Sequence, residues 1–327
     1  MRNLLLFLFL FTNGLVHAQF FKQDNGLAHT FSIVARDEKT GEMAVGVQSH
    51  WFSVGTSVSW AEAGVGAVAT QSFTNKSFGI RGLGLLKAGK TAQEALDILL
   101  SDDPGKEVRQ VAIVDAKGNV ANFTAKNCID FAGDLKGKGY AIQANMMLTN
   151  EVPAAMAKAY EANSALPLAE RVLATLKAAQ KVGGDIRGKQ SAVILVVKGE
   201  ATGKPWDDNH LVDLRVDDHA APLVELERLL TLHRAYEHMN NGDLATEKND
   251  MPLAMKEYEA AMKMFPNNLE MQYWTAITLA NNGNVAKAAK MLKGVYAKDP
   301  LWRELTKRLP KAGVLTVKAE EMGVLVK

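Results

Sequence analysis

The sequence predicts a two-part protein, with a four-layer α/β/β/α sandwich over residues 30–220 and an all-helical domain over residues 221–327. Upstream of residue 220, short apolar runs typical of strands alternate with glycine-bounded turns and helical patterns. Downstream, almost every stretch has helical periodicity, and such a shift in pattern is typical of a domain boundary. Two strand layers, each flanked by a pair of helices, would bury every apolar face of the first part.

The chain begins with the pattern of a cleavable signal peptide. Arg2 supplies one positive charge, residues 4–11 are apolar, and small or permissive residues lead up to Ala18. The apolar run is shorter than the roughly 20 residues that span a bilayer, which disfavours a retained membrane anchor. We therefore expect residues 1–18 to be a signal peptide, 19–29 to be an N-terminal segment or propeptide, and the protein to be periplasmic or secreted.

Composition excludes several classes of partner. A net charge of +2 gives no basic footprint for nucleic acid and no polybasic patch for a membrane surface. No later segment is long and apolar enough to be a transmembrane helix, and no pattern indicates a cofactor. The single cysteine, Cys128, excludes an internal disulfide framework and is expected to be a small buried apolar residue. The oligomeric state stays open.

The first part begins with a predicted hairpin, in which strands 30–36 and 43–49 are antiparallel and joined by a turn ending at Gly41. Thr91 with Glu94 three residues later forms the pattern of a capping box at the start of a helix. The remaining expected strands are 65–71, 109–115, 119–124, 140–146, 191–197 and 211–216, and the expected helices are 78–88, 91–100, 153–161 and 168–181.

Three stretches resemble a known bacterial family. They are residues 30–37 (TFSIVARD), residues 65–71 (VGAVATQ) and residues 183–192 (GGDIRGKQSA). Together and in this order they resemble the family called domain of unknown function 1028, over about residues 29–220. The resemblance implies the N-terminal-nucleophile (Ntn) hydrolase fold, a proteasome-like α/β/β/α sandwich. It implies no established reaction.

Chemistry in the Ntn superfamily uses a Thr, Ser or Cys at the first position of the first strand, with its own free α-amine as the base. Thr30 opens the first strand and is the candidate nucleophile, and Ser32 faces the same side. Signal cleavage would leave Gln19 first, so a second cut after His29 is required to free the amine of Thr30. The alternative is that Thr30 is simply a β-branched residue that begins a strand.

Further candidates lie at strand ends and in one glycine-rich loop. Strand-end donors to a developing oxyanion would come from Thr70, Gln71 and Asn145. The loop 183–191 could orient an amide or carboxylate, with the guanidinium of Arg187 as a bidentate donor. Its other candidate residues are Asp185, Gln190 and Ser191. The alternative for the loop is an ion pair between Asp185 and Arg187 that closes a helix-to-strand turn.

Acidic residues and histidines gather at 207–210 and 217–219. They flank a short predicted strand and precede a helix that begins at Pro222, and their spacing matches no known ligand pattern. We therefore interpret them as solvated loop residues and expect no metal site.

The helical part carries a repeat, because Pro266 and Pro300 are 34 residues apart, which is the tetratricopeptide period. The packing positions of the motif are filled by Ala254, Tyr258 and Ala261 in one unit and by Ala276, Leu279, Ala288 and Leu292 in the next. Val295 replaces the usual small residue, and an irregular loop is expected between a helix at 223–240 and Met251. The resemblance implies a groove for a peptide or protein partner, or a helical cap that only stabilises.

The sequence thus leaves two functions open. The first is an exported amide-bond hydrolase in which a second cleavage exposes Thr30. The second is a non-catalytic binding protein that holds a peptide or protein partner with its helical repeats or with the loop 183–191.

Overall fold

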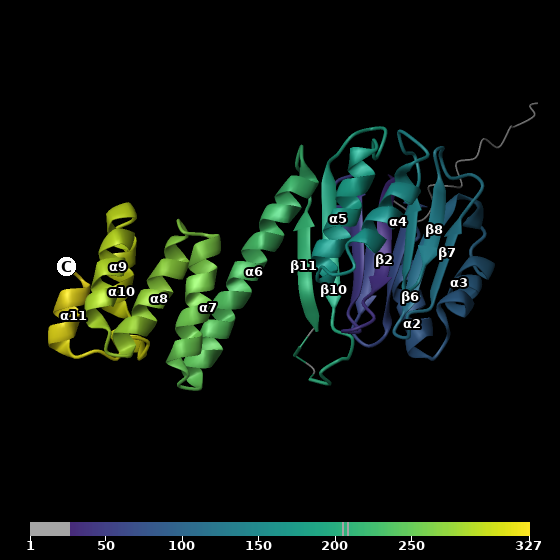
Figure 1. The fold of residues 1–327 in the computed structure, drawn as a ribbon. Coiled ribbons are helices and arrows are strands. Elements are labelled where there is room, and N and C mark those ends of the chain that lie inside the picture. The colour runs from purple at the N-terminus through teal and green to yellow at the C-terminus, as the bar shows by residue number, and fades with distance from the viewer. Residues whose placement is uncertain (1–26, 205, 208) are drawn as a thin grey trace, which may run out of the picture. The chain divides into compact units, whose positions relative to one another are not determined.

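The computed structural model describes residues 27–204, 206–207 and 209–327 and divides them into two compact units that meet between Leu226 and Glu227 (Figure 1). The expected signal peptide and nearly all of the expected segment 19–29 lie outside the described residues. Within the described part, no helix is both long enough and apolar enough to cross a membrane.

The first unit contains two antiparallel sheets. One has the order β1-β5-β6-β7, with β4 also paired to β5, and the other has the order β11-β10-β3-β2-β9-β8. The strands of the first sheet are β1 (Leu27–Ala28), β4 (Ser59–Glu62), β5 (Gly66–Phe73), β6 (Arg109–Asp115) and β7 (Val120–Thr124). The strands of the second sheet are β2 (Thr30–Arg36), β3 (Met43–Ser49), β8 (Gly133–Gly137), β9 (Tyr140–Ala144), β10 (Ser191–Val197) and β11 (His210–Val216).

Helices cover the outer face of each sheet. The first sheet is covered by α2 (Ser77–Lys87) and α3 (Ala92–Ser101), and the second by α4 (Val152–Ala162) and α5 (Leu168–Lys181). Strand β2 packs against β5 and β6 of the opposite sheet, so the two sheets stack face to face. The four-layer α/β/β/α sandwich that the sequence predicts is therefore confirmed, as is the antiparallel pairing of β2 with β3, in which Thr30 lies opposite Ser49. The remaining short elements are α1 (Gly55–Val58) and η2 (Lys106–Val108).

Three local features of the first unit follow the sequence. The predicted capping box of α3 is present, with the Thr91 side chain accepting from the Glu94 backbone N–H and Glu94 bonding back. Gly46 in β3 lies beneath α5, where a Cβ atom would come within 2.2 Å of Val172 Cγ1, so only glycine allows this approach. Cys128 is buried as a free thiol, as expected, and burial raises the pKa of that thiol.

The second unit is helical. Its elements are α6 (Pro222–Glu247), which begins in the first unit, α7 (Met251–Met264), α8 (Leu269–Asn281), α9 (Val285–Lys298), α10 (Leu301–Arg308), η3 (Pro310–Ala312) and α11 (Ala319–Leu325). The alanines predicted to lie at helix contacts, Ala254, Ala261, Ala276 and Ala288, are all fully buried. The tetratricopeptide register itself stays a prediction.

One expectation for this region was wrong. The helix expected to end at Asn240 continues through Asn241 and Gly242 to Glu247, so the irregular loop before Met251 is only three residues long. Position 242 requires a glycine, because a Cβ atom there would lie 2.4 Å from Cε1 of the Tyr258 ring. The final residues form helix α11.

Candidate active site

The interior of the sandwich changes from apolar to polar toward one end. Side chains alternate along a strand, so every second residue faces the opposite sheet. In β2 the inward row runs from Val34 to Ser32 to Thr30, and in β5 it runs from Ala69 to Gln71. Strands β3, β6 and β9 also carry polar residues at this end. The fully buried polar residues here include Thr30, Ser32, Ser49, Gln71, Gln110, Gln143 and Asn145.

Amide side chains from both sheets bond to one another here. Gln110 Oε1 accepts from Gln71 Nε2 at 2.7 Å and from Asn145 Nδ2 at 2.8 Å. Ser32 Oγ donates to Gln71 Oε1 at 2.7 Å and accepts from Gln143 Nε2 at 3.2 Å. Gln71, Gln110 and Asn145 each use both the oxygen and the nitrogen of the amide, so the network fixes which way these three amides point.

The backbone at Thr30 is held by this network and by β1. Gln71 Nε2 donates to the Thr30 carbonyl at 3.0 Å, and Asn145 donates its backbone N–H to the same oxygen at 3.1 Å. The preceding residues pair with the first sheet through β1, where Ala28 lies opposite Ser72. The peptide bond between His29 and Thr30 therefore sits where the chain passes from one sheet to the other.

The carbonyl oxygen of His29 receives two side-chain hydrogen bonds. Ser49 Oγ donates at 2.6 Å and Arg187 Nη2 donates at 2.7 Å. The hydroxyl of Thr30 is buried, and no other described residue forms a hydrogen bond with it. A peptide carbonyl with two donors, next to an unengaged hydroxyl, is an arrangement that stabilises negative charge on that oxygen.

Asp185 holds Arg187 in this position. Arg187 Nε and Nη2 lie 3.0 and 2.7 Å from the two oxygens of Asp185, which is a bidentate pair. Asp185 is itself buried, accepts from the backbone N–H of His50 at 3.2 Å, and forms a β-bridge with Met147. The loop 183–191 is thus anchored, and the ion pair proposed as the structural alternative is also what directs Arg187 to His29.

His29 is buried, and its surroundings favour the neutral imidazole. Burial lowers the pKa of its imidazole, and the nearby Arg187 lowers it further, although the hydrogen bond with Asn145 acts in the opposite direction. Its Nδ1 lies 2.8 Å from Asn145 Oδ1, and Asn145 uses its amide nitrogen to donate to Gln110. Oδ1 must therefore accept, so the proton of the neutral imidazole is assigned to Nδ1. The ring also contacts Phe73 edge-on at 5.7 Å.

Not every predicted site residue joins this cluster. Thr70 Oγ1 donates to the backbone carbonyl of Asn75 at 3.3 Å, and Gln190 donates to Asp218 at 3.1 Å. Ser191 Oγ donates to the Trp51 carbonyl and accepts from Val54 N–H, so it orders the segment before α1. Thr30, Ser32, Gln71, Asn145, Asp185 and Arg187 do lie together. Their catalytic roles stay predictions.

Four residues of the cluster were not singled out from the sequence: His29, Ser49, Gln110 and Gln143. A signal for two of them was present, because Gln110 and Gln143 are amides next to apolar residues in predicted strands. Ser49 ends a predicted strand, which by itself is common. His29 had no signal, since its place depends on contacts with residues more than a hundred positions away.

The acidic and histidine residues near β11 form ordinary local bonds. Asp207 pairs with Lys198 at 2.8 Å and bonds to the backbone N–H of Asn209. These interactions, that with Lys198 being the largest, lower the pKa of Asp207 to about 2. In the part of the chain that the structure describes, no three His, Cys, Asp or Glu side chains are grouped to hold a metal ion.

Comparison with known proteins identifies the family of the first unit. The two stacked antiparallel sheets with helices on both outer faces form an α/β/β/α sandwich. Residues 30–226 match the family described as a family of unknown function (DUF1028), and the chain belongs to that family.

Two solved structures are similar to the chain. Protein SPO2555 from Silicibacter pomeroyi, a DUF1028 protein, is 32% identical, with 62% of this chain and 84% of that chain covered and a TM-score of 0.55. Anbu (ancestral beta-subunit) from Yersinia bercovieri is 10% identical, with 62% of this chain and 93% of that chain covered and a TM-score of 0.31. No curated protein matches the chain.

Proposed function

We propose that the protein is an exported amide-bond hydrolase whose nucleophile, Thr30, is freed when the chain cleaves its own His29–Thr30 peptide bond. One observation carries the proposal. The carbonyl oxygen of that bond accepts from Ser49 Oγ and Arg187 Nη2, while the adjacent Thr30 hydroxyl is buried and unengaged.

The proposed cleavage proceeds in two balanced steps. The Thr30 hydroxyl oxygen attacks the His29 carbonyl carbon through a five-membered ring, and the oxyanion is stabilised by Ser49 and Arg187. The C–N bond then breaks, the amide nitrogen takes up the hydroxyl proton, and an ester joins His29 to Thr30. Water hydrolyses the ester, which leaves the His29 carboxylate and a Thr30 with a free amine and a free hydroxyl.

The same groups then serve an external substrate. The free α-amine, with an ordinary pKa of about 7.7 to 8.0, accepts the proton of the Thr30 hydroxyl as the oxygen attacks an amide carbonyl. Departure of His29 releases Ser49 Oγ and Arg187, so both become available to the substrate oxyanion. Departure of β1 also uncovers the edge of β5 near Phe73, where the preceding residues lie before cleavage.

Intact-mass analysis and N-terminal sequencing of the purified full chain test the proposal. We expect the chain to begin at Thr30. Thr30→Ser should still be cleaved, whereas Thr30→Val should remain uncleaved and inactive against amide substrates. Thr30→Val should fold normally, since the hydroxyl that it removes has no hydrogen-bond partner among the described residues. Arg187→Ala should slow cleavage by about a hundredfold, which is typical for loss of an oxyanion donor.

Thr70→Val is the matched control. It also replaces a buried threonine in a strand, but its hydroxyl bonds to the Asn75 carbonyl, away from His29. It should leave cleavage unchanged. The proposal is wrong if the wild-type chain retains His29, or if Thr30→Val is cleaved at the same bond.

A further inference from the structure

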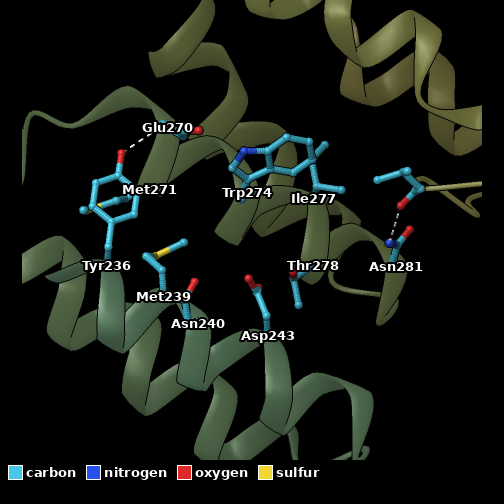
Figure 2. A pocket seen from close by; sticks show the side chains of 11 residues that line it. Tyr236, Met239, Asn240, Asp243, Glu270, Met271, Trp274, Ile277, Thr278 and Asn281 are labelled. Carbon is cyan, nitrogen blue, oxygen red and sulfur yellow. Dashed lines mark hydrogen bonds between the residues drawn. The ribbon is translucent and has the colours of Figure 1, made fainter. Parts of the chain in front are cut away.

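The helical unit contains a pocket of about 380 Å³. It lies between α6 and α8 (Figure 2), and Val314 also lines it. Its size falls within the range of ligand-binding sites, about 300–1,000 Å³. Figure 2 shows Asn240 and Asp243 on α6 facing Trp274 on α8 across the opening.

Two carboxylates at the pocket are already oriented by tyrosines. Tyr236 donates its hydroxyl to Glu270 Oε2, and Tyr258 donates to Asp243 Oδ1, each at 2.7 Å. In each case the bond occupies one oxygen of the carboxylate, and no described residue donates a hydrogen bond to the other. The tyrosine bonds thus hold both anions in place without neutralising their charge.

The remaining lining favours a cation with an apolar stem. Among the described residues, no lysine, arginine or histidine lines the pocket, while the rings of Trp274 and Tyr236 do. A cation is attracted to an indole face, and a nearby carboxylate attracts it further. Met239 and Ile277 supply apolar surface for a methylene chain. Arg234, a basic residue on α6, is paired with Glu237 at 2.8 Å.

We propose that this pocket binds a lysine side chain of a peptide partner. The ammonium group lies against Trp274 between the carboxylates of Asp243 and Glu270, and the aliphatic stem packs on Met239. This site goes beyond the proposed hydrolase, because all its residues lie in the second unit. Binding is therefore measured on the full-length Thr30→Val protein, so that the result does not depend on cleavage.

The probes are acetylated and amidated pentapeptides, Ala-Ala-X-Ala-Ala, in which X is lysine, norleucine or glutamate. Norleucine keeps the stem of lysine and lacks the charge. The readout is the NMR shift of the Trp274 indole N–H, assigned with Trp274→Phe. We expect a saturable shift with the lysine peptide, binding at least threefold weaker with norleucine, and none with glutamate. Added salt should weaken the lysine complex.

Two isosteric variants test the carboxylates. Glu270→Gln and Asp243→Asn keep an acceptor for the tyrosines and should each weaken lysine binding by about three- to tenfold. Glu259→Gln, an exposed carboxylate on α7 that does not line the pocket, is the matched control and should change nothing. Equal binding of the norleucine peptide, unchanged binding in both variants, or no shift with the lysine peptide would each overturn the proposal.

Discussion

Replacing Gln110 by methionine tests the buried amide network directly. Methionine has nearly the same length as glutamine but carries no amide. In the wild-type chain Gln110 Oε1 accepts from two amides, and its Nε2 donates to Thr124 Oγ1 at 2.8 Å and to the Ala144 carbonyl at 2.9 Å. Nε2 also donates to the Gly133 carbonyl at 3.3 Å, so the change removes five hydrogen bonds from the interior of the sandwich.

The size of the expected stability loss depends on which hydrogen-bond partners of Gln110 find no other partner. Asn145 Nδ2 loses its acceptor and becomes a buried unsatisfied donor, which costs about 1–3 kcal/mol. Gln71 Nε2 keeps the Thr30 carbonyl at 3.0 Å, so it loses less. The lost donations from Gln110 Nε2 to Thr124 and to Ala144 each add about 1 kcal/mol to the loss of stability. Burial of the apolar methionine side chain offsets part of this loss. We expect a net loss of about 3 kcal/mol, against a stability of about 5–15 kcal/mol for a typical domain.

Hydrogen–deuterium exchange is the suitable assay, because it reports the free energy of opening in peptides from β5, β6 and β9 separately from the helical unit. Gln93→Met is the matched control, since the Gln93 amide bonds to Asp97 on the exposed face of α3. It should change stability by less than about 0.5 kcal/mol. If Gln110→Met has no larger effect than this control, the network does not stabilise the sandwich as described.

Two further predictions concern stability. Asp103→Asn should cost about 3 kcal/mol at neutral pH, because it leaves Arg109, its buried partner at 2.7 Å, without a counter-charge. Burial alone would raise the pKa of Asp103, but hydrogen bonds from Arg109 and Gly105 hold that pKa below 3.8. In urea unfolding, the stability difference between variant and wild type should therefore shrink as the pH falls through the lowered pKa. Ala288→Leu should cost about 1–3 kcal/mol by overpacking α9, whereas the exposed Ala286→Leu should not; equal melting temperatures for the two would contradict the packing described.

Much of the fold could be predicted because its strands carry local patterns. The bounds of β2, β3 and β10 follow from apolar runs and turn residues, and they match the structure. Strands β1, β4 and β8 have two, four and five residues, too few for a pattern to stand out. They form because their backbones pair with a neighbouring strand, and that pairing depends on the tertiary structure.

The candidate site could be predicted only in part. Alternation along β2 places Thr30 and Ser32 on one face, which a single strand is enough to show. The contact between Arg187 and His29 spans 158 positions, and nothing local in the sequence encodes it. In α6 a local signal was present but misleading. Asn240, Asn241 and Gly242 favour turns, yet the helix continues through them, and Gly242 packs against Tyr258.

The buried hydroxyl of Thr30 argues that this end of the sandwich is not optimised for stability. A hydroxyl buried without a partner costs about 1–3 kcal/mol, and a valine would fill the same volume without that cost. Another unsatisfied atom, Gln143 Oε1, lies at the same end. Unsatisfied buried atoms also occur elsewhere in the described residues, for example at Asn122 and Tyr160, but the Thr30 hydroxyl adjoins the peptide bond that Ser49 and Arg187 polarise. The cost at Thr30 therefore falls on the group that the proposed chemistry would use.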